Sequence, residues 1–265
     1  MDSIFIGVAA HKAYQMPEAS VYHPIQVGAT GKPLLSGYQP DNVGENISIL
    51  NPNFSELTAT YWLWKNCNAD YKGLVHYRRY FTMHKPRSPF HVGKFRDVMT
   101  TSQWGDLLAE FPVVLPSQRH YYVETLYSHY QHSHNIEPLD ITRGIIQRDF
   151  HEYLDSFDEV MQRKSAHMFN MFVMRADYYD DYSSWLFRIL FELQNRVDIS
   201  DYSVQEARVF GYISELLLDV WLNVHQPKYA EVPVVFMENQ HWGKKIWYFG
   251  MRKLFGGSRK DAHIE

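Results

Sequence analysis

Apolar and polar positions follow one another in blocks along the chain, and these blocks predict its elements. Short runs rich in Ile, Val, Leu and Phe, bounded by turn residues, are typical of buried strands. Such runs predict strands at residues 3–10, 21–27, 73–78, 111–115, 168–174 and 231–236. Because helical patterns separate many of these strands, the order predicts an α/β fold with a mostly parallel central sheet.

Apolar residues at helical spacing predict a helical C-terminal part. The spacing predicts two long helices, at residues 177–196 and 204–224, and further helices at 121–130 and 141–162. An earlier helix is predicted to begin with Asn53 as its N-cap and Glu56 at the N3 position, and to end near Asn66. Residues 28–53 are rich in Gly, Pro, Asn and Asp and predict a long loop before it.

The composition is that of a globular protein with a substantial core. The chain has 265 residues, of which 45% are hydrophobic and 21% charged. A formal net charge of −4 argues against a broadly basic surface that binds nucleic acid. The single cysteine, Cys67, excludes a disulfide scaffold and favours a reducing, cytoplasmic compartment. We expect no signal peptide and no membrane-spanning segment.

The last part of the chain differs from the rest in charge. Residues 243–260 carry only basic charges, interleaved with Trp247, Phe249 and other large apolar side chains. Such a segment fits peripheral contact with an anionic membrane surface, although a last helix packed on the body with a basic outer face fits equally well. We therefore expect one domain over residues 1–240, followed by a basic aromatic tail at 241–265.

The segment 69–81, ADYKGLVHYRRYF, carries the clearest chemical signal. Its strand delivers a row of polar and aromatic side chains to a carboxyl end, which is where open α/β sheets bind ligands. They are His76, Tyr77, Arg78, Arg79 and Tyr80. Two adjacent arginines cannot both point inward, and an unpaired buried guanidinium is costly, so at least one should meet an anion. Since arginine binds phosphate oxygens through two hydrogen bonds, a diphosphate or carboxylate site is favoured over a solvated basic turn.

Three other groups of polar residues could carry chemistry. The loop at 41–56 offers many amides and carboxylates to a hydroxyl-rich ligand, although turn formation and capping explain it as well. Glu206, Arg208 and Glu215 lie near the start of a predicted helix, where a carboxylate can act as a general base or lie on the helix surface.

The third group is His129, His132 and His134, with Asp140 nearby. Their spacing does not match a helical zinc pair, so a single catalytic or hydroxyl-binding histidine is favoured over a metal site. Plain surface histidines remain the default interpretation.

Several common motifs are absent from the sequence. It contains no G-x-G-x-x-G, no G-x-x-x-x-G-K-[ST] and no G-x-S-x-G, which removes the main support for a dinucleotide-dependent dehydrogenase, a P-loop nucleotide hydrolase or a serine hydrolase. It also contains no D-x-D.

The order of the longer motifs resembles a known family. NISILNPNFSELTATYWLWKN, GLVHYRRYF, MFNMFVM and ARVFGYISELLLDVWL are similar to a glycosyltransferase family of bacterial capsule and exopolysaccharide gene clusters, formerly catalogued as a domain of unknown function. The resemblance covers residues 4–224. It implies a GT-A-like nucleotide-sugar-binding sandwich and the inverting transfer of galactose, in its furanose form, from a UDP-sugar donor.

The resemblance also implies which residues hold the donor. The first strand and its following loop would hold the nucleotide, which here involves Ala10, His11 and Lys12. The strand that usually ends in a metal-binding D-x-D here ends in HYRRY. We therefore expect no metal cofactor, with Arg78 and Arg79 stabilising the UDP leaving group directly. A divalent metal is the disfavoured alternative.

An inverting transfer needs a base for the acceptor hydroxyl. By resemblance Glu215 is the first candidate, Glu206 the second and Asp140 a remote third, while Asn170 would bind sugar hydroxyls. The other candidate substrate-binding residues are Asn46, Asn53, Glu56, His76, His134 and Arg208.

The family implies an acceptor and a location. The acceptor would be a lipid-linked oligosaccharide of capsule, exopolysaccharide or O-antigen synthesis, at the inner face of the cytoplasmic membrane. Two alternatives stay open from the residues themselves. One is a non-catalytic carbohydrate-binding protein of polysaccharide assembly, and the other is a metal-dependent hydrolase built on the histidine cluster.

Overall fold

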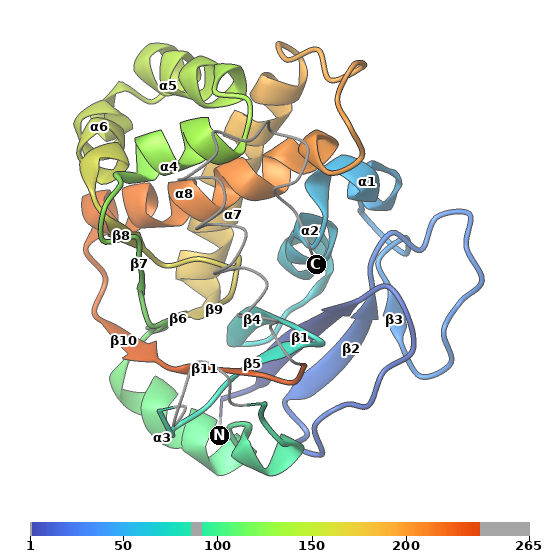
Figure 1. Cartoon of the computed structure of the whole chain (residues 1–265). Helices are drawn as coiled ribbons and strands as arrows, with labels where there is room; N and C mark the ends of the chain where they lie inside the picture. Colours follow the sequence, from blue (N-terminus) through green and yellow to red (C-terminus); the bar gives the residue numbers. More distant parts are fainter. Residues whose placement is uncertain (1, 86–91, 239–265) are drawn as a thin grey trace.

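A mixed sheet with helices on both faces forms the body of the protein (Figure 1). The computed structural model describes residues 2–85 and 92–238, so the predicted tail at 241–265 lies outside the described residues. The main strand order is β10-β6-β9-β4-β1-β2-β3. The strands are β1 (Ile4–Ala10), β2 (Tyr22–Gln26), β3 (Gln39–Pro40), β4 (Tyr71–His76), β6 (Val113–Pro116), β9 (Phe172–Arg175) and β10 (Tyr229–Val232).

Most neighbouring strands on this path are parallel. The strands β3, β2, β1 and β4 pair in parallel, as do β6 and β10, and only β9 runs antiparallel to its neighbours β4 and β6. The predicted α/β fold with a mostly parallel sheet is confirmed. A short ribbon of β5 (Arg79–Phe81) and β11 (Val234–Phe236) extends from the end of β4, and β7 (Arg119–His120) pairs with β8 (Ser165–Ala166).

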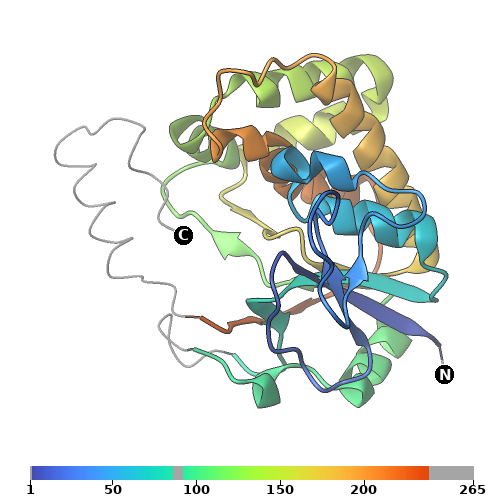
Figure 2. The same cartoon turned by 90° about the vertical axis from the view of Figure 1, so that its right-hand side faces the viewer.

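Helices cover the sheet on two sides. The helices are α1 (Asn51–Phe54), α2 (Leu57–Asn66), α3 (Thr101–Glu110), α4 (Leu126–Ser133), α5 (Glu137–Asp149), α6 (Leu154–Gln162), α7 (Ala176–Gln194) and α8 (Val209–His225), with 3₁₀ turns at Ser48–Leu50, Phe95–Asp97, His151–Tyr153 and Glu206–Arg208. Figures 1 and 2 show α4 to α8 on one side of the sheet and α3 on the other.

The residues of β1 alternate between two apolar cores. Ala9 packs into the core under α2, α7 and α8, whereas Ile6 and Val8 pack into the core under α3. Side chains of a strand point alternately to opposite faces, so a sheet covered on both sides needs apolar residues at every position. This explains why SIFIGVAA is an unbroken apolar run.

Several predicted boundaries are wrong in detail. Asn53 is not an N-cap, because α1 contains it and the chain turns at Ser55 (φ 52°) before α2 begins at Leu57. The predicted helix at 141–162 is two helices, since Phe150 leaves the helical conformation (φ −142°). The predicted helices at 121–130 and 204–224 begin later, at α4 and α8.

The strands that approach the site also end differently from their predictions. The predicted strand 73–78 ends at His76, and the chain reverses there into β5. The predicted strand 168–174 begins only at Phe172, since the preceding turn contains two residues with positive φ. Within the described residues, no helix is both long and apolar enough to cross a bilayer.

Candidate functional site

The carboxyl ends of β1, β2 and β4 lie at one edge of the sheet, where Ala10 pairs with Gln26 and Ala9 with His76. The tight turn after β4 sends the two predicted arginines in different directions. The Arg78 guanidinium lies 4.9 Å from the centroid of the Tyr77 ring and forms a 3.3 Å ion pair with Glu238. Arg79 lies 4.7 Å from the Phe169 ring centroid, and the charges of Glu215 and Glu56 act on it.

Glu215, on the second turn of α8, is the carboxyl with the most perturbed proton affinity in this region. Burial, followed by the charge of Glu56, raises the pKa of Glu215 to about 7, against the opposing effects of Arg79, Arg119 and a hydrogen bond from the Phe169 backbone. A carboxyl group with a pKa near the working pH is suited to accept a proton from a substrate hydroxyl.

A turn with two residues in the left-handed conformation lies next to His76 and Glu215. Phe169 (φ 81°) and Asn170 (φ 49°) precede β9, and such a conformation is uncommon for residues other than glycine. The Phe169 carbonyl accepts a hydrogen bond from His76 Nε2 at 2.7 Å. Since a carbonyl can only accept, Nε2 carries the proton and Nδ1 is left as an acceptor. Backbone strain of this kind is concentrated at functional sites.

Asn170 holds the second carboxylate of the site. Its Nδ2 donates to Glu56 Oε1 at 2.6 Å and to the Gly211 carbonyl at 3.1 Å, and its Oδ1 accepts from Ser214 at 2.7 Å. The side chain is only 3% exposed. All of these partners belong to the protein, so the structure gives Asn170 a positioning role, and binding of sugar hydroxyls stays a prediction.

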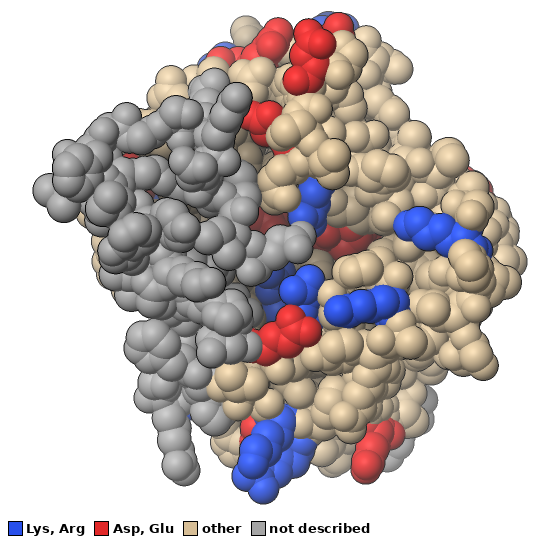
Figure 3. Space-filling model, turned by 45° about the vertical axis from the view of Figure 1, so that its right-hand side comes forward, with Lys and Arg blue, Asp and Glu red and all other residues tan. Residues whose placement is uncertain are grey.

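His76 is held in its neutral form. Burial, Arg79 and Arg208 lower the pKa of His76, against the opposing effects of Glu56 and the Phe169 carbonyl. Arg208 is itself fixed at the start of α8, where its Nε donates to Ser55 Oγ at 3.0 Å. The site therefore combines neutral and charged hydrogen-bonding groups, and Figure 3 shows acidic and basic side chains gathered around a hollow on this face.

Aromatic rings border the site beside Arg78. The ring of His11 lies edge-on to Tyr77 at 5.4 Å, and Lys12 Nζ lies 5.7 Å from the same ring centroid. Tyr14 also contacts the Tyr77 ring, at 5.0 Å, and donates to Glu238 Oε1 at 3.1 Å. His11 and Lys12, which were predicted to bind the nucleotide, thus lie beside the same Tyr77 ring as Arg78.

Three residues of the site were missed from the sequence: Tyr14, Arg119 and Glu238. Arg119 comes from the separate strand β7, and Glu238 follows β11, so neither lies near the predicted motifs along the chain. Tyr77, within the HYRRY motif, was predicted at this strand end, and the structure places its ring between His11 and Arg78.

Other predicted residues lie away from Glu215 or serve local structure. Asp140 is exposed on α5 and accepts a 3.0 Å hydrogen bond from Tyr127, so its position does not support a role as base. Asn46 donates to the Gly44 carbonyl, as turn formation requires, and Asn53 donates to the Ala207 carbonyl at 2.9 Å. Glu206 accepts from Ser203 Oγ at 2.9 Å on the turn before α8.

The three histidines of the predicted cluster do not converge on one point. His129 and His132 both contact Glu124, at 3.2 and 3.0 Å, whereas the ring of His134 stacks on Tyr212 at 4.2 Å. Across residues 2–85 and 92–238, no group of three His, Cys, Asp or Glu side chains is arranged to hold a metal ion. The alternative of a histidine-based hydrolase therefore lacks its ligand set in this part of the chain.

Comparisons with known proteins agree with the fold. The family model described as "Domain of unknown function (DUF4422)" matches residues 5–226. A solved apo structure of the bifunctional glycosyltransferase WbbM superimposes with a TM-score of 0.84 at 28% sequence identity, covering 90% of this chain. The chain spans 46% of the length of that protein. No curated protein sequence matches the chain. The fold is thus that of part of a glycosyltransferase.

Proposed function

The chain belongs to the family described as Domain of unknown function (DUF4422), and we propose that it is a glycosyltransferase that moves a hexose from a UDP-sugar to a glycan acceptor. One observation carries the proposal: Glu215, with a pKa near 7, lies where the charge of Arg79 acts on it, at the ligand-binding edge of the sheet. A proton acceptor and an anion-binding guanidinium are the two groups that such a transfer needs.

The donor side of the reaction is assigned to the corner around Tyr77. Ala10, His11 and Lys12 would bind the nucleotide beside the Tyr77 ring, and Arg78 would exchange Glu238 for the diphosphate. Arg79 is the second guanidinium available to the charge that develops on the leaving UDP. Because two arginines can neutralise a diphosphate without a cation, the proposed transfer needs no metal cofactor.

The acceptor side is assigned to Glu215. The acceptor hydroxyl oxygen forms the new bond to the anomeric carbon while the bond from that carbon to the UDP oxygen breaks. The hydroxyl proton passes to Glu215, and the electron pair of the broken bond leaves with UDP. Attack from the face opposite UDP inverts the anomeric configuration. Burial, followed by the charge of Glu56, which Asn170 fixes in place, keeps the pKa of Glu215 high enough for this role.

The proposal extends to the identity of the donor sugar and of the acceptor. We assign the donor as UDP-galactose in its furanose form and the acceptor as a lipid-linked oligosaccharide of capsule, exopolysaccharide or O-antigen synthesis. The reaction would take place at the cytoplasmic face of the membrane, which the basic tail at 241–265 would contact. These assignments rest on the family resemblance and on the charge pattern of the tail.

Calorimetric titration of UDP tests the proposal directly. The wild type should bind UDP in excess EDTA, Arg79→Ala should weaken binding at least tenfold, and the exposed Arg96→Ala serves as the matched control. Glu215→Gln should keep UDP binding and lose transfer from a UDP-hexose.

The other outcomes of this titration test the metal-free mechanism and the nucleotide-sugar function separately. Binding that requires Mn²⁺ would overturn the metal-free mechanism alone. Absence of UDP binding with and without Mn²⁺ would overturn the nucleotide-sugar function and favour a non-catalytic carbohydrate-binding protein.

A further inference from the structure

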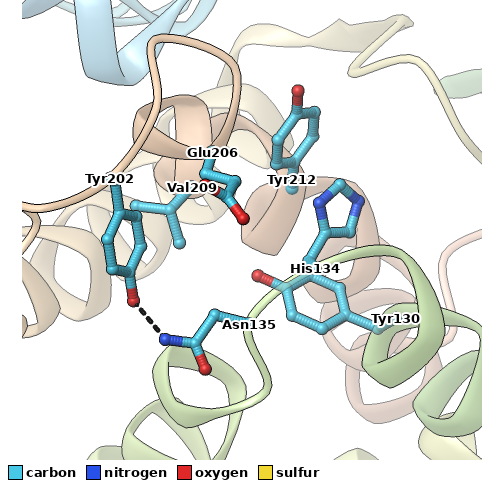
Figure 4. Close-up of a pocket in the computed structure, with 7 residues that line it drawn as sticks. All are labelled: Tyr130, His134, Asn135, Tyr202, Glu206, Val209 and Tyr212. Atoms are coloured by element: carbon cyan, nitrogen blue, oxygen red, sulfur yellow. Dashed lines mark hydrogen bonds between the residues drawn. The ribbon is translucent and has the colours of Figure 1, made fainter. Parts of the chain in front are cut away.

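A small pocket lies between the end of α4 and the start of α8 (Figure 4). Three tyrosine rings and three polar side chains contribute to its lining: Tyr130, Tyr202, Tyr212, His134, Asn135 and Glu206. Figure 4 shows the Tyr130 hydroxyl and the Glu206 carboxylate directed into the space between the two chain segments. The space accommodates a group of about the size of one water molecule.

The Tyr130 hydroxyl is the unusual feature of this pocket. The side chain is only 4% exposed, and its hydroxyl has no hydrogen-bond partner within the described part of the chain. The neighbouring tyrosines are satisfied: Tyr202 accepts from Asn135 Nδ2 at 2.7 Å, and Tyr212 accepts from Gln205 Nε2 at 2.8 Å. A buried hydroxyl without a partner destabilises the fold, so proteins keep few of them without a reason.

The pocket shares a wall with the candidate reaction centre. Tyr212 lies three residues before Glu215 on α8, which places both side chains on the same side of the helix. The charges of Glu215 and Glu56 both act on the Tyr212 hydroxyl, and Arg208 lies 5.9 Å from its ring centroid. Tyr212 therefore lines the pocket and also lies within reach of the charges of both carboxylates.

We propose that this pocket receives one hydroxyl group of the acceptor sugar and selects acceptors that carry it. The inference rests on the proposed function. The sugar hydroxyl accepts a hydrogen bond from Tyr130 and donates one to the Glu206 carboxylate. The apolar C–H face of the sugar ring packs on Tyr212, as sugar rings do on aromatic side chains.

The position of the pocket favours the acceptor over the donor. Helices α4 and α8 build it, whereas the corner assigned to the nucleotide is built by the ends of β1 and β4. A site built to pair a substrate hydroxyl rejects analogues that lack it, because its own polar groups are then left buried and unpaired. Tyr130 is thus a residue that determines acceptor specificity.

The test measures sugar binding by ligand-observed NMR in saturating UDP. The probes are the methyl β-glycosides of galactose and glucose, together with their monodeoxy analogues. Wild type should bind at least one parent glycoside about 3- to 10-fold more tightly than one of its deoxy analogues. Tyr130→Phe should abolish that preference without loss of stability, since its hydroxyl has no protein partner to lose.

A matched control separates this role from a general effect of losing a hydroxyl. Tyr71→Phe also removes a buried hydroxyl, one that donates to the Leu108 carbonyl under α3, and should keep the deoxy preference. The inference is overturned if wild type shows no preference, if Tyr130→Phe retains it, or if the preference appears in the affinity for UDP-hexoses instead. Absence of UDP binding to wild type would overturn the proposed function separately.

Discussion

The side-chain amide of Asn170 donates a 2.6 Å hydrogen bond to the carboxylate of Glu56. This contact ties the left-handed turn before β9 to the start of α2. The same turn contacts Glu215 through the Phe169 backbone, so the two carboxylates are held relative to each other by adjacent residues. Burial raises the pKa of Glu215 most, and the repulsion between the two carboxylates adds to it.

The first prediction concerns the effect of Glu56 on Glu215. In Glu56→Gln the amide oxygen can still accept from Asn170, but the negative charge is removed. Because that charge raises the pKa of Glu215, its removal should lower this pKa. The acidic limb of the kcat/KM profile for transfer should therefore move to lower pH.

The exposed residue Glu45 supplies the control for this experiment. Glu45→Gln should leave the acidic limb in place. An unmoved limb in Glu56→Gln would show that Glu56 does not act on the catalytic proton transfer.

The second prediction links Glu215 to stability. Between pH 4.5 and about 7 the unfolded chain has lost the Glu215 proton while the folded chain keeps it. The folded state then binds more protons, so the free energy of unfolding falls as pH rises, by about 3 kcal/mol in total. Because glutamine does not titrate, Glu215→Gln should remove this pH-dependent fall in the free energy of unfolding.

Urea unfolding at pH 4 and pH 8.5 measures the second prediction. From pH 4 to pH 8.5, the free energy of unfolding of Glu215→Gln should rise by about 3 kcal/mol relative to that of the wild type. The control variant Glu18→Gln, at an exposed position, should show no such rise in the free energy of unfolding. A pH-independent difference between wild type and Glu215→Gln would contradict the raised pKa.

The strands and the position of the paired arginines could be predicted because their signals are local. A strand buried on both faces is a continuous apolar run, as SIFIGVAA is for β1. Arg79 follows the buried strand β4 after a two-residue turn, so its place at the carboxyl edge of the sheet follows from the strand itself. Glu215 was selected through the family resemblance, and the structure places it where the charge of Arg79 acts on it.

The rest depends on contacts between distant segments. The start of α2 was misplaced because Ser55 adopts a positive φ next to Arg208, which is far away in sequence. The turn at Phe169 and Asn170 was missed since neither residue is a glycine, the usual sign of a left-handed turn. Arg119 was missed because only the folded chain brings β7 toward Glu215.

The third prediction concerns a buried cluster of charged groups formed by His167, Asp219 and Glu231. His167 is 1% exposed, and its Nδ1 lies 2.6 Å from Asp219 while its Nε2 lies 3.3 Å from Glu231. Burial alone would lower the pKa of His167, but the hydrogen bond and charge of Asp219, together with Glu231, raise it. The resulting stability is present below pH 6.5 and is lost as pH rises through the raised pKa.

Asp219→Asn tests this cluster. The variant leaves a buried imidazolium without its main partner, which should cost about 3–5 kcal/mol at pH 5.5 and less at pH 9. Chemical unfolding at both pH values measures the difference, with the exposed Asp155→Asn as control. A loss that is equal at both pH values would mean that His167 is neutral throughout.

The fourth prediction concerns Asp41, a fully buried carboxylate in the loop between β3 and α1. It accepts hydrogen bonds from the backbone amides of Gly28 and Ala29, at 2.7 and 3.0 Å, and from the hydroxyls of Ser48 and Thr58, at 2.5 and 2.6 Å. These bonds tie the loop to the first turn of α2.

Asp41→Asn should therefore lower both stability and activity. The asparagine NH₂ group cannot accept from the donors that face it, so buried groups lose their partners, at a cost of about 3–5 kcal/mol. Because Thr58 lies two residues after Glu56, loosening this turn should also weaken the positioning of Glu56 and lower kcat more than UDP affinity.

Thermal and urea unfolding, with transfer assays at a temperature where the variant is folded, measure both effects. The exposed Asp106→Asn carries the same chemical change and should match wild type. An unfolding free energy for Asp41→Asn within about 0.5 kcal/mol of wild type, the usual range for surface substitutions, would show that the loop is held by other contacts. A large loss of stability with unchanged kcat would instead show that the loop does not position Glu56 for the reaction.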